Sequence, residues 1–328
     1  MKKALSALTL SMFVTPALAQ LSEQAGFSGE ISLNAGYTTS TSNFNTSGDK
    51  TIDSVNQDPE QESGFLAAPL GNLAYTFGES LNQQVYAGMS REDIAVGTLA
   101  LEVGYKYQLG SGTIIDVSLL PTVMSGETWE DPFLTGSRRS TTEERGNAFR
   151  LKLSNIFTPG FNLDMAYATK DIEDEASGTS NSELQDGEEK LLERDSHSYY
   201  LKGSYRLPLD RTTFLQPSVT YIKTEADGEA NSLTSLGGEI SLFKVINRHQ
   251  FALTAGYTNR AYDKQNPLYD KTRDENQLSL FAAYEYQHFM GWQDWSLIGL
   301  AGYGANNANI GFYDNQESLL SVGINYHF

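Results

Sequence analysis

The sequence predicts an all-β fold, an antiparallel up-and-down β-barrel of about fourteen strands. Three observations favour this fold. Apolar residues recur at every second position, aromatic residues recur at both ends of the apolar runs, and long connections tend to alternate with short ones. A period of two places apolar side chains on one face of a strand. An even strand number suits a closed antiparallel barrel, and the chain shows no convincing helical pattern.

The first residues have the pattern of a secretory signal peptide. Lys2 and Lys3 precede an apolar run that is too short to span a bilayer, and Ala17-Leu18-Ala19 has the small-x-small form of a cleavage site. We therefore expect residues 1–19 to be removed and residues 20–328 to form one barrel domain. No cysteine lies beside the cleavage site for a lipid anchor. The chain contains none at all, so no disulfide supports the fold.

The strands follow from the alternation. In LALEVGYKYQL, residues 99–109, Leu101, Val103 and Tyr105 share one face, whereas Glu102 and Lys106 share the other. The same pattern, with varying clarity, predicts strands at residues 27–39, 65–77, 83–90, 97–109, 113–124, 147–156, 161–172, 197–207, 212–224, 232–245, 249–261, 276–286, 295–305 and 316–328. The strand at 83–90 has the weakest pattern.

The connections differ in length between the two ends of the strands. A long polar segment, residues 42–64, follows the first strand, whereas turns such as 110–112, 158–160 and 247–248 are tight. Short turns on one side and long loops on the other are typical of a transmembrane barrel, with the short side facing the periplasm. A β-sandwich would have no reason to separate them in this way.

Aromatic residues form two belts in this map. On strands inferred to run outward, the apolar face begins with residues such as Phe27 and Phe251 and ends with Tyr37 and Tyr257. Amphipathic rings prefer the headgroup level, so two belts around an apolar band indicate a barrel in lipid. For any single tyrosine, a core or rim position would be the simpler interpretation. It is the register shared by most strands that favours the membrane.

Charge excludes some partners. Acidic residues number 41 and basic residues 23, giving a net charge of −18, and the mean hydropathy is −0.39. This balance argues against nucleic acid, because neutralising phosphates requires a basic surface. The chain is also too polar for helical membrane spans. A solvated acidic surface that keeps the protein soluble by repulsion remains the plain alternative.

The chain ends on an aromatic strand, SVGINYHF. Val322, Ile324, Tyr326 and Phe328 fall on one face, which we expect to contact lipid while the strand pairs with the first one near Phe27. The Ala-Leu-Ala motif, the alternating strands with long acidic loops, and the ending LLSVGINYHF resemble Gram-negative outer-membrane β-barrel proteins, including uncharacterised porin-like families of marine gammaproteobacteria. The resemblance covers the mature chain as an architecture and carries over no functional residue.

The resemblance implies a cell outer membrane location, with lipid and lipopolysaccharide as neighbours. It also implies that the terminal aromatic and the alternate apolar positions before it are a signal for the barrel-assembly machinery. The final strand indicates where the protein resides and leaves the solute open.

The inward face carries the candidate functional residues. We expect five at mid-height of the lumen, in a field that orients and filters small hydrophilic solutes: Glu102, Arg150, Lys152, Lys202 and Glu239. Further lumen charges are expected at Glu30, Lys106, Asp116, Asp164, Lys170, Arg206, Arg260 and Glu285. The basic residues cluster on the sixth to eighth strands, and Glu30, Glu102, Glu239 and Glu285 fall on walls away from them. Alternatively, the charges pair between neighbouring strands and fill the interior.

The long loops are strongly acidic, above all residues 171–195 and the loop after the first strand. Solvated loops are the simpler interpretation, and a bridge to lipopolysaccharide through divalent cations is the other. Neither loop has a calcium-loop pattern, so no metal site is expected. One long loop could instead fold inward and narrow the pore, and the sequence does not say which.

These patterns predict a channel for passive diffusion of small hydrophilic solutes, with no catalytic residue and no cofactor. An outer-membrane hydrolase would need a Ser-His-acid geometry, which Ser196, His197 and Ser198 beside Glu193 and Asp195 do not establish. A transporter of hydrophobic cargo would need an N-terminal plug and an apolar lumen. A receptor, an adhesin or a structural barrel, with the acidic loops as its working surface, is the main alternative.

Overall fold

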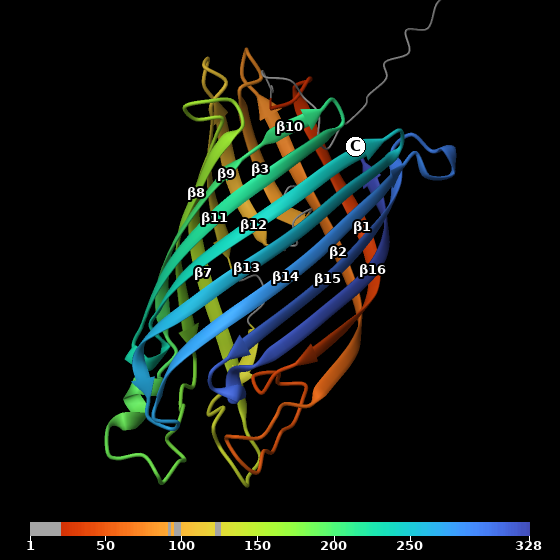
Figure 1. Cartoon of the computed structure of the whole chain (residues 1–328). Coiled ribbons are helices and arrows are strands. Elements are labelled where there is room, and N and C mark those ends of the chain that lie inside the picture. The colour runs from red at the N-terminus through yellow and green to blue at the C-terminus, as the bar shows by residue number, and fades with distance from the viewer. Residues whose placement is uncertain (1–20, 91–92, 95–99, 122–125) are drawn as a thin grey trace, which may run out of the picture.

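The structure, a computed structural model, describes residues 21–90, 93–94, 100–121 and 126–328 and forms a closed β-barrel (Figure 1). The signal peptide predicted at residues 1–19 lies outside the described residues, as do parts of the predicted strands at 97–109 and 113–124. Within the described residues, no helix is long and apolar enough to cross a membrane.

The wall is antiparallel throughout and follows the chain order. Its strands are β1 (Gly26–Thr41), β2 (Gln61–Phe77), β3 (Gln83–Met89), β4 (Leu101–Gln108), β5 (Ile114–Pro121), β6 (Gly126–Trp129), β7 (Thr141–Ser154), β8 (Phe161–Ile172), β9 (Ser196–Tyr205), β10 (Leu207–Asp210), β11 (Thr213–Ala226), β12 (Leu233–Ile246), β13 (His249–Asn266), β14 (Lys271–Gln287), β15 (Trp295–Ala308) and β16 (Asn315–His327). Within the described residues, four 3₁₀ turns lie between strands: η1 (Glu188–Leu192), η2 (Glu229–Asn231), η3 (Phe289–Gly291) and η4 (Gly311–Tyr313).

Two of the short strands continue their predecessors. Both β5 and β6 pair with β7, and both β9 and β10 pair with β11. Each of these pairs is one pass of the chain through the wall, so the barrel has 14 strands, as the sequence predicts.

The first and last strands close the barrel. β1 pairs with β16 in a register that places Ala35 opposite Val322. At the end of the ladder, the Gly29 and Phe328 backbones exchange two N–H···O hydrogen bonds of 3.0 Å. The prediction that the final strand pairs with the first is therefore confirmed.

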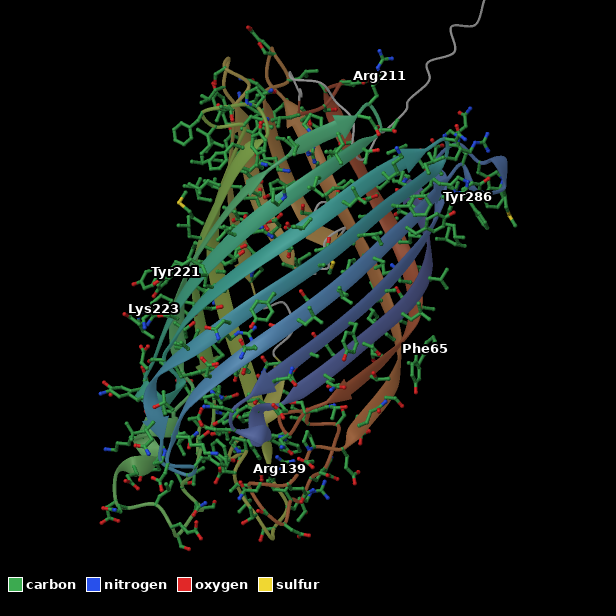
Figure 2. All side chains as sticks on the ribbon, in the orientation of Figure 1. Phe65, Arg139, Arg211, Tyr221, Lys223 and Tyr286 are labelled. Atoms are coloured by element: carbon green, nitrogen blue, oxygen red, sulfur yellow. The ribbon has the colours of Figure 1, made fainter. Side chains whose placement is uncertain are left out.

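The barrel is polar inside and apolar outside. On β1, Leu33 is 70% exposed on the outer face, whereas the neighbouring Ser32 and Asn34 are buried on the inner face. Figure 2 shows Phe65 and Tyr221 pointing away from the wall in the same manner, and both are exposed. Such a surface is stable only where hydrocarbon replaces water, so the exposed band marks the lipid contact.

Aromatic rings border this band. Near the end with the short turns, the ring centroids of Phe27 and Tyr75 lie 4.8 Å apart, those of Trp295 and Tyr326 5.0 Å, and those of Tyr326 and Phe328 6.1 Å. Towards the other end, exposed tyrosines such as Tyr37, Tyr167, Tyr199, Tyr257 and Tyr303 form the second belt. Both belts predicted from the sequence are present.

Several strands extend further towards the long connections than the alternation indicates. β7 begins at Thr141 instead of 147, β14 begins at Lys271 instead of 276, and β13 ends at Asn266 instead of 261. Beyond the lipid, both faces of a strand contact water, so the apolar alternation stops while the backbone ladder continues. The alternation therefore reports lipid contact better than it reports strand length.

The long connections are packed together at the lower end of the barrel in Figure 1. Six of the connections at this outer end contribute to one apolar cluster, here called the outer cap. Its buried residues are Ile52, Phe133, Leu192, Ala230, Ile310, Phe312 and Tyr313, with Leu268 and Tyr269 packed against them. Connections that begin on opposite sides of a barrel share a core only if they meet across its mouth. The interpretation of these loops as simply solvated missed this core.

Polar groups join the connections of the cap as well. The Tyr269 hydroxyl donates to the Val55 carbonyl at 2.8 Å, and Trp129 Nε1 donates to the Asn43 carbonyl at 3.0 Å. Arg139, which Figure 2 labels in this region, is 2% exposed, and its guanidinium donates to three carbonyl oxygens of the connections. Burial lowers the pKa of Arg139, although Asp49 and Asp131 lie near enough to favour the charged form.

Candidate functional site in the barrel lumen

A cluster of charges lies on the inner wall around β7. Arg150 and Lys152 are two residues apart on this strand, so both side chains enter the lumen. Arg150 Nη2 lies 2.5 Å from Asp164 Oδ2 on β8, and its Nη1 lies 2.8 Å from Asp93 Oδ2. Lys152 Nζ lies 3.1 Å from the same Asp93 oxygen. Guanidinium and ammonium donors form charge-assisted hydrogen bonds with carboxylates, and such bonds are stronger than those between neutral groups.

Glu102 belongs to this cluster, and its predicted place on a wall away from the basic residues is wrong. It is 1% exposed, and its carboxylate lies 3.6 Å from Arg150 Nη1 and 3.7 Å from Lys152 Nζ. Ser118 Oγ also donates to it at 3.0 Å. Only β5 separates β4 from β7, and two strand spacings of nearly 5 Å are within reach of these long side chains.

The predicted position of Glu239, on a wall away from the basic residues, is wrong as well, because a basic residue reaches it across one strand. Lys202 Nζ on β9 lies 3.1 Å from Glu239 Oε1 on β12, across the single intervening strand β11. Ser218 on that strand donates to the same oxygen at 3.4 Å. The five residues predicted at mid-height thus form paired groups along one side of the wall, as in the ion-pair alternative, instead of facing one another across the channel.

Two described residues between β3 and β4 lie inside the barrel. Asp93 and Ile94 lie in the lumen, where Asp93 contacts β7 as described and Ile94 N–H donates to the Ser90 carbonyl at 2.9 Å. The sequence left open which long loop folds inward, and among the described residues Asp93 and Ile94, between β3 and β4, lie inside the barrel. The other six outer connections meet in the outer cap.

The remaining predicted charges are distributed along the inner wall. Lys106 Nζ lies 3.9 Å from Asp116, which accepts a 2.7 Å hydrogen bond from Tyr86. Arg260 Nη1 lies 3.4 Å from Glu275 Oε2. Lys170 on β8 is the cross-strand partner of Gly146 on β7 and of Ser196 on β9. The Arg206 guanidinium lies 4.5 Å from the Phe214 ring centroid.

Glu30 and Glu285 lie on the other side of the barrel, away from β7, as the sequence map expects. His327 is placed between them: its Nδ1 lies 3.4 Å from Glu30 Oε2, and its Nε2 lies 3.3 Å from Glu285 Oε1. Asn325 Nδ2 donates to Glu30 Oε2 at 2.8 Å. This group is near the end with the short turns.

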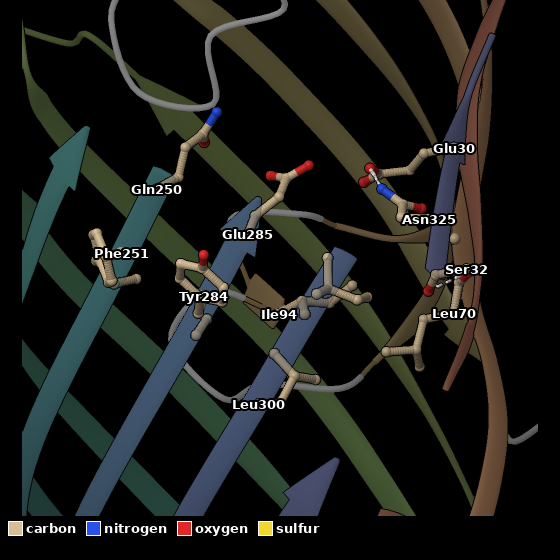
Figure 3. A pocket seen from close by; sticks show the side chains of 14 residues that line it. Glu30, Ser32, Leu70, Ile94, Gln250, Phe251, Tyr284, Glu285, Leu300 and Asn325 are labelled. Carbon is tan, nitrogen blue, oxygen red and sulfur yellow. Dashed lines mark hydrogen bonds between the residues drawn. The ribbon is translucent and has the colours of Figure 1, made fainter. Parts of the chain in front are cut away.

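A small pocket lies between this acidic wall and Ile94 (Figure 3). Leu70, Ala252 and Leu300 line it together with the two glutamates. The sequence map missed this apolar lining, although Leu70 and Leu300 have the inward parity of their strands and could have been found by it. It also missed Asp93, because a single acidic residue in a loop carries no signal of its position.

The serine-histidine arrangement considered for catalysis does not form around His197. Its Nε2 lies 2.7 Å from Glu225 Oε2, whereas Ser198 Oγ lies 2.8 Å from Thr224 Oγ1. Among the described side chains, no group of three or more His, Cys, Asp or Glu is arranged to hold a metal ion.

Residues 26–327 match a family model described as "Protein of unknown function (DUF2860)". The comparison with curated proteins gave no match. Among solved structures, the outer membrane channel DcaP of Acinetobacter baumannii is similar at 10% identity, covering 93% of this chain and 97% of the other with a TM-score of 0.45. The anion-selective porin from Comamonas acidovorans is similar at 9% identity, covering 93% and 100% with a TM-score of 0.43. A loop-deleted form of OmpT, an outer membrane protein of Vibrio cholerae, is similar at 11% identity, covering 93% of this chain and 100% of the other with a TM-score of 0.42. None of these similarities assigns a role to a residue of this chain.

Proposed function

The chain belongs to the family described as proteins of unknown function (DUF2860) and is an outer-membrane β-barrel, and we propose that it is a channel for the passive diffusion of small hydrophilic solutes. The proposal rests on the geometry of this barrel. An apolar outer band between two aromatic belts sets the barrel in lipid, and charged side chains on the inner face keep the lumen hydrated.

The observation that carries the proposal is the segment at Asp93 and Ile94, held inside the lumen by Arg150 and Lys152. A barrel much wider than eight strands is not filled by the side chains of its wall alone. Here Asp93 and Ile94 lie in the lumen, and Asp93 meets the wall through charged groups, which supports a narrowed passage with polar sides. Such a constriction selects solutes by size and charge.

Purified full-length protein in a planar bilayer tests the proposal. We expect discrete conductance steps of a narrow channel, and small hydrophilic solutes should enter liposomes that contain the protein. Val219→Ala, on the lipid face, is a matched control that should leave the conductance unchanged because this side chain is outside the lumen. Folded barrels that give no discrete conductance would contradict the channel.

A second function is favoured by the outer cap. Six connections that share an apolar core present an ordered surface to the exterior, as a receptor, an adhesin or a structural barrel would. The two functions differ in one measurement, since a barrel that works only through its surface gives no conductance with the cap intact. We propose no catalytic role.

The partners follow from the same geometry. We propose that the exposed band contacts outer-membrane lipid and that the acidic cap faces lipopolysaccharide. The exposed residues Val322, Ile324, Tyr326 and Phe328 of the last strand form the segment that the barrel-assembly machinery would read.

A further inference from the structure

The turn between β14 and β15 is the longest of the inner turns that the structure describes. It comprises residues 288–294 and includes η3, whereas the other inner turns leave between two and six residues between their strands. Backbone hydrogen bonds order it: Gly291 N–H donates to the His288 carbonyl at 2.9 Å, and Trp292 N–H donates to the Phe289 carbonyl at 3.0 Å. The side chains of this turn are therefore presented in defined directions.

The turn exposes large apolar side chains. Met290 is 72% exposed and Trp292 is 52% exposed, and residues 288–294 include no lysine or arginine. Figure 1 shows this blue turn projecting sideways from the wall instead of continuing along the barrel axis, and Figure 2 labels Tyr286 at its base. Because contact of such side chains with water is unfavourable, this surface is suited to an apolar neighbour.

Trp292 joins the turn to the inner aromatic belt. The ring centroids of Trp292 and Trp295 lie 5.9 Å apart. Trp295 contacts Tyr326 at 5.0 Å between centroids, and Tyr326 contacts Phe328 at 6.1 Å. A row of rings thus runs from the lipid-facing end of β16 to the turn. Since amphipathic rings of a belt lie at the headgroup level, the turn lies at that level too.

The inner end of the barrel is apolar on another side as well. Phe157, in the turn between β7 and β8, is 93% exposed, and its ring centroid lies 6.2 Å from that of Phe161. β7 and β8 are far from β14 and β15 in the order of strands around the wall. A membrane surrounds the barrel, whereas a protein partner or a second copy of the chain contacts one side. Apolar turns on two sides therefore favour lipid as the neighbour.

We propose that the β14–β15 turn is an interfacial anchor, which inserts Met290 and Trp292 among the phospholipids of the inner leaflet. Tryptophan suits this level because its ring is apolar while its Nε1–H can donate to a headgroup or to water. With no lysine or arginine in the turn, the contact depends on apolar area, so it should persist in uncharged phosphatidylcholine and at high salt. The inference goes beyond the proposed channel, because the anchor sets the depth of the inner rim whether or not the lumen conducts.

Spin labelling of the full chain in phosphatidylcholine liposomes tests the anchor. The sequence has no cysteine, so Met290→Cys provides a single attachment site for a nitroxide. Oxygen concentrates in hydrocarbon and a nickel chelate stays in water, so their collision rates with the nitroxide report its depth. Ser111→Cys, exposed in the tight turn between β4 and β5, is the matched control at the same end of the barrel.

We expect the ratio of oxygen to chelate collisions to be about tenfold higher at position 290 than at position 111, at low and at high salt. Equal ratios at the two positions would overturn the anchor. A label at position 290 that is shielded from both reagents would also overturn it, because the neighbour would then be protein.

A second pair of variants tests the anchoring side chain. Trp292→Glu, combined with the label at position 290, should lower the collision ratio to that of the control, because a carboxylate stays in water. Gln293→Glu adds the same charge at the next exposed residue and should leave the ratio high. Heat-modifiable electrophoresis shows that each variant is folded. Equal ratios in these two variants would overturn the role of Trp292.

Conductance distinguishes the anchor from the channel. A barrel that conducts while the label at position 290 lies in water refutes the anchor alone. A barrel that does not conduct while this label lies in lipid refutes the channel and supports the anchor.

Discussion

Replacing Asp93 by Asn tests whether the inward segment is held by charge. The Asp93 carboxylate lies 2.8 Å from Arg150 Nη1 and 3.1 Å from Lys152 Nζ. The amide of Asn has nearly the same size and can still accept a hydrogen bond, but it carries no charge. Arg150 would still contact Asp164 at 2.5 Å, and both Arg150 and Lys152 would still contact the Glu102 carboxylate. The wall should therefore stay folded while the segment loses its anchor.

The magnitude follows from these two contacts. A hydrogen bond to a charged partner contributes about 2 kcal/mol, whereas a neutral one contributes about 1 kcal/mol. Two contacts thus lose about 2 kcal/mol in total, which corresponds to a roughly thirtyfold shift between the anchored and the released segment. Water in the lumen screens these charges, so this value is an upper estimate.

Single-channel recording in planar bilayers measures the effect. We expect Asp93→Asn to show sublevels of larger conductance, with a frequency raised by up to about thirtyfold over wild type. Asp93→Glu should restore the wild-type pattern because it keeps the charge. Asp270→Asn, the same change at an exposed site outside the lumen, is the control. Identical conductance and identical sublevel frequency in Asp93→Asn and wild type would refute the reasoning.

Four further predictions concern the wall and the cap. Arg150→Gln with Lys152→Gln should shift permeability towards cations by up to about tenfold, and unchanged reversal potentials would place the pair outside the constriction. Phe328→Ala should remove a ring contact of about 1 kcal/mol with its neighbour and lower the fraction of assembled barrel on heat-modifiable gels. Ile52→Asp buries an unpaired charge in the cap at a cost of about 3 kcal/mol or more, so the outer connections should become sensitive to protease. Burial raises the pKa of Tyr313 above its ordinary 10.0, so its contribution to the cap is present below pH 10 and is lost as the pH rises further, which proteolysis across alkaline pH would detect.

The barrel, its strand number and its closure could be predicted from the sequence. Lipid contact imposes a period-two pattern on every strand, as at Ile31 and Leu33, because each outward side chain must be apolar. The same rule made Val322, Ile324 and Phe328 recognisable as the outer face of the last strand. Strand ends were less predictable, since beyond the lipid no such pattern is required.

Inside the lumen, the sequence determined which charges face inward but not their partners. Glu102 reaches Arg150 across an intervening strand, at a separation that depends on barrel curvature and on side-chain length. The outer cap shows the same limit, because the burial of Ile52 depends on loops from far along the chain.

The sequence by itself determined the fold, the lipid-facing surface and the inward charges, since each follows from a local rule about the side chain and its solvent. Only the tertiary structure decided that Asp93 and Ile94 lie in the lumen and that Asp93 meets Arg150 there. It also decided that Gln250, Glu285 and Leu300 share one pocket. Contacts of this kind join residues far apart in the chain, and the closed barrel alone fixes the distances between them.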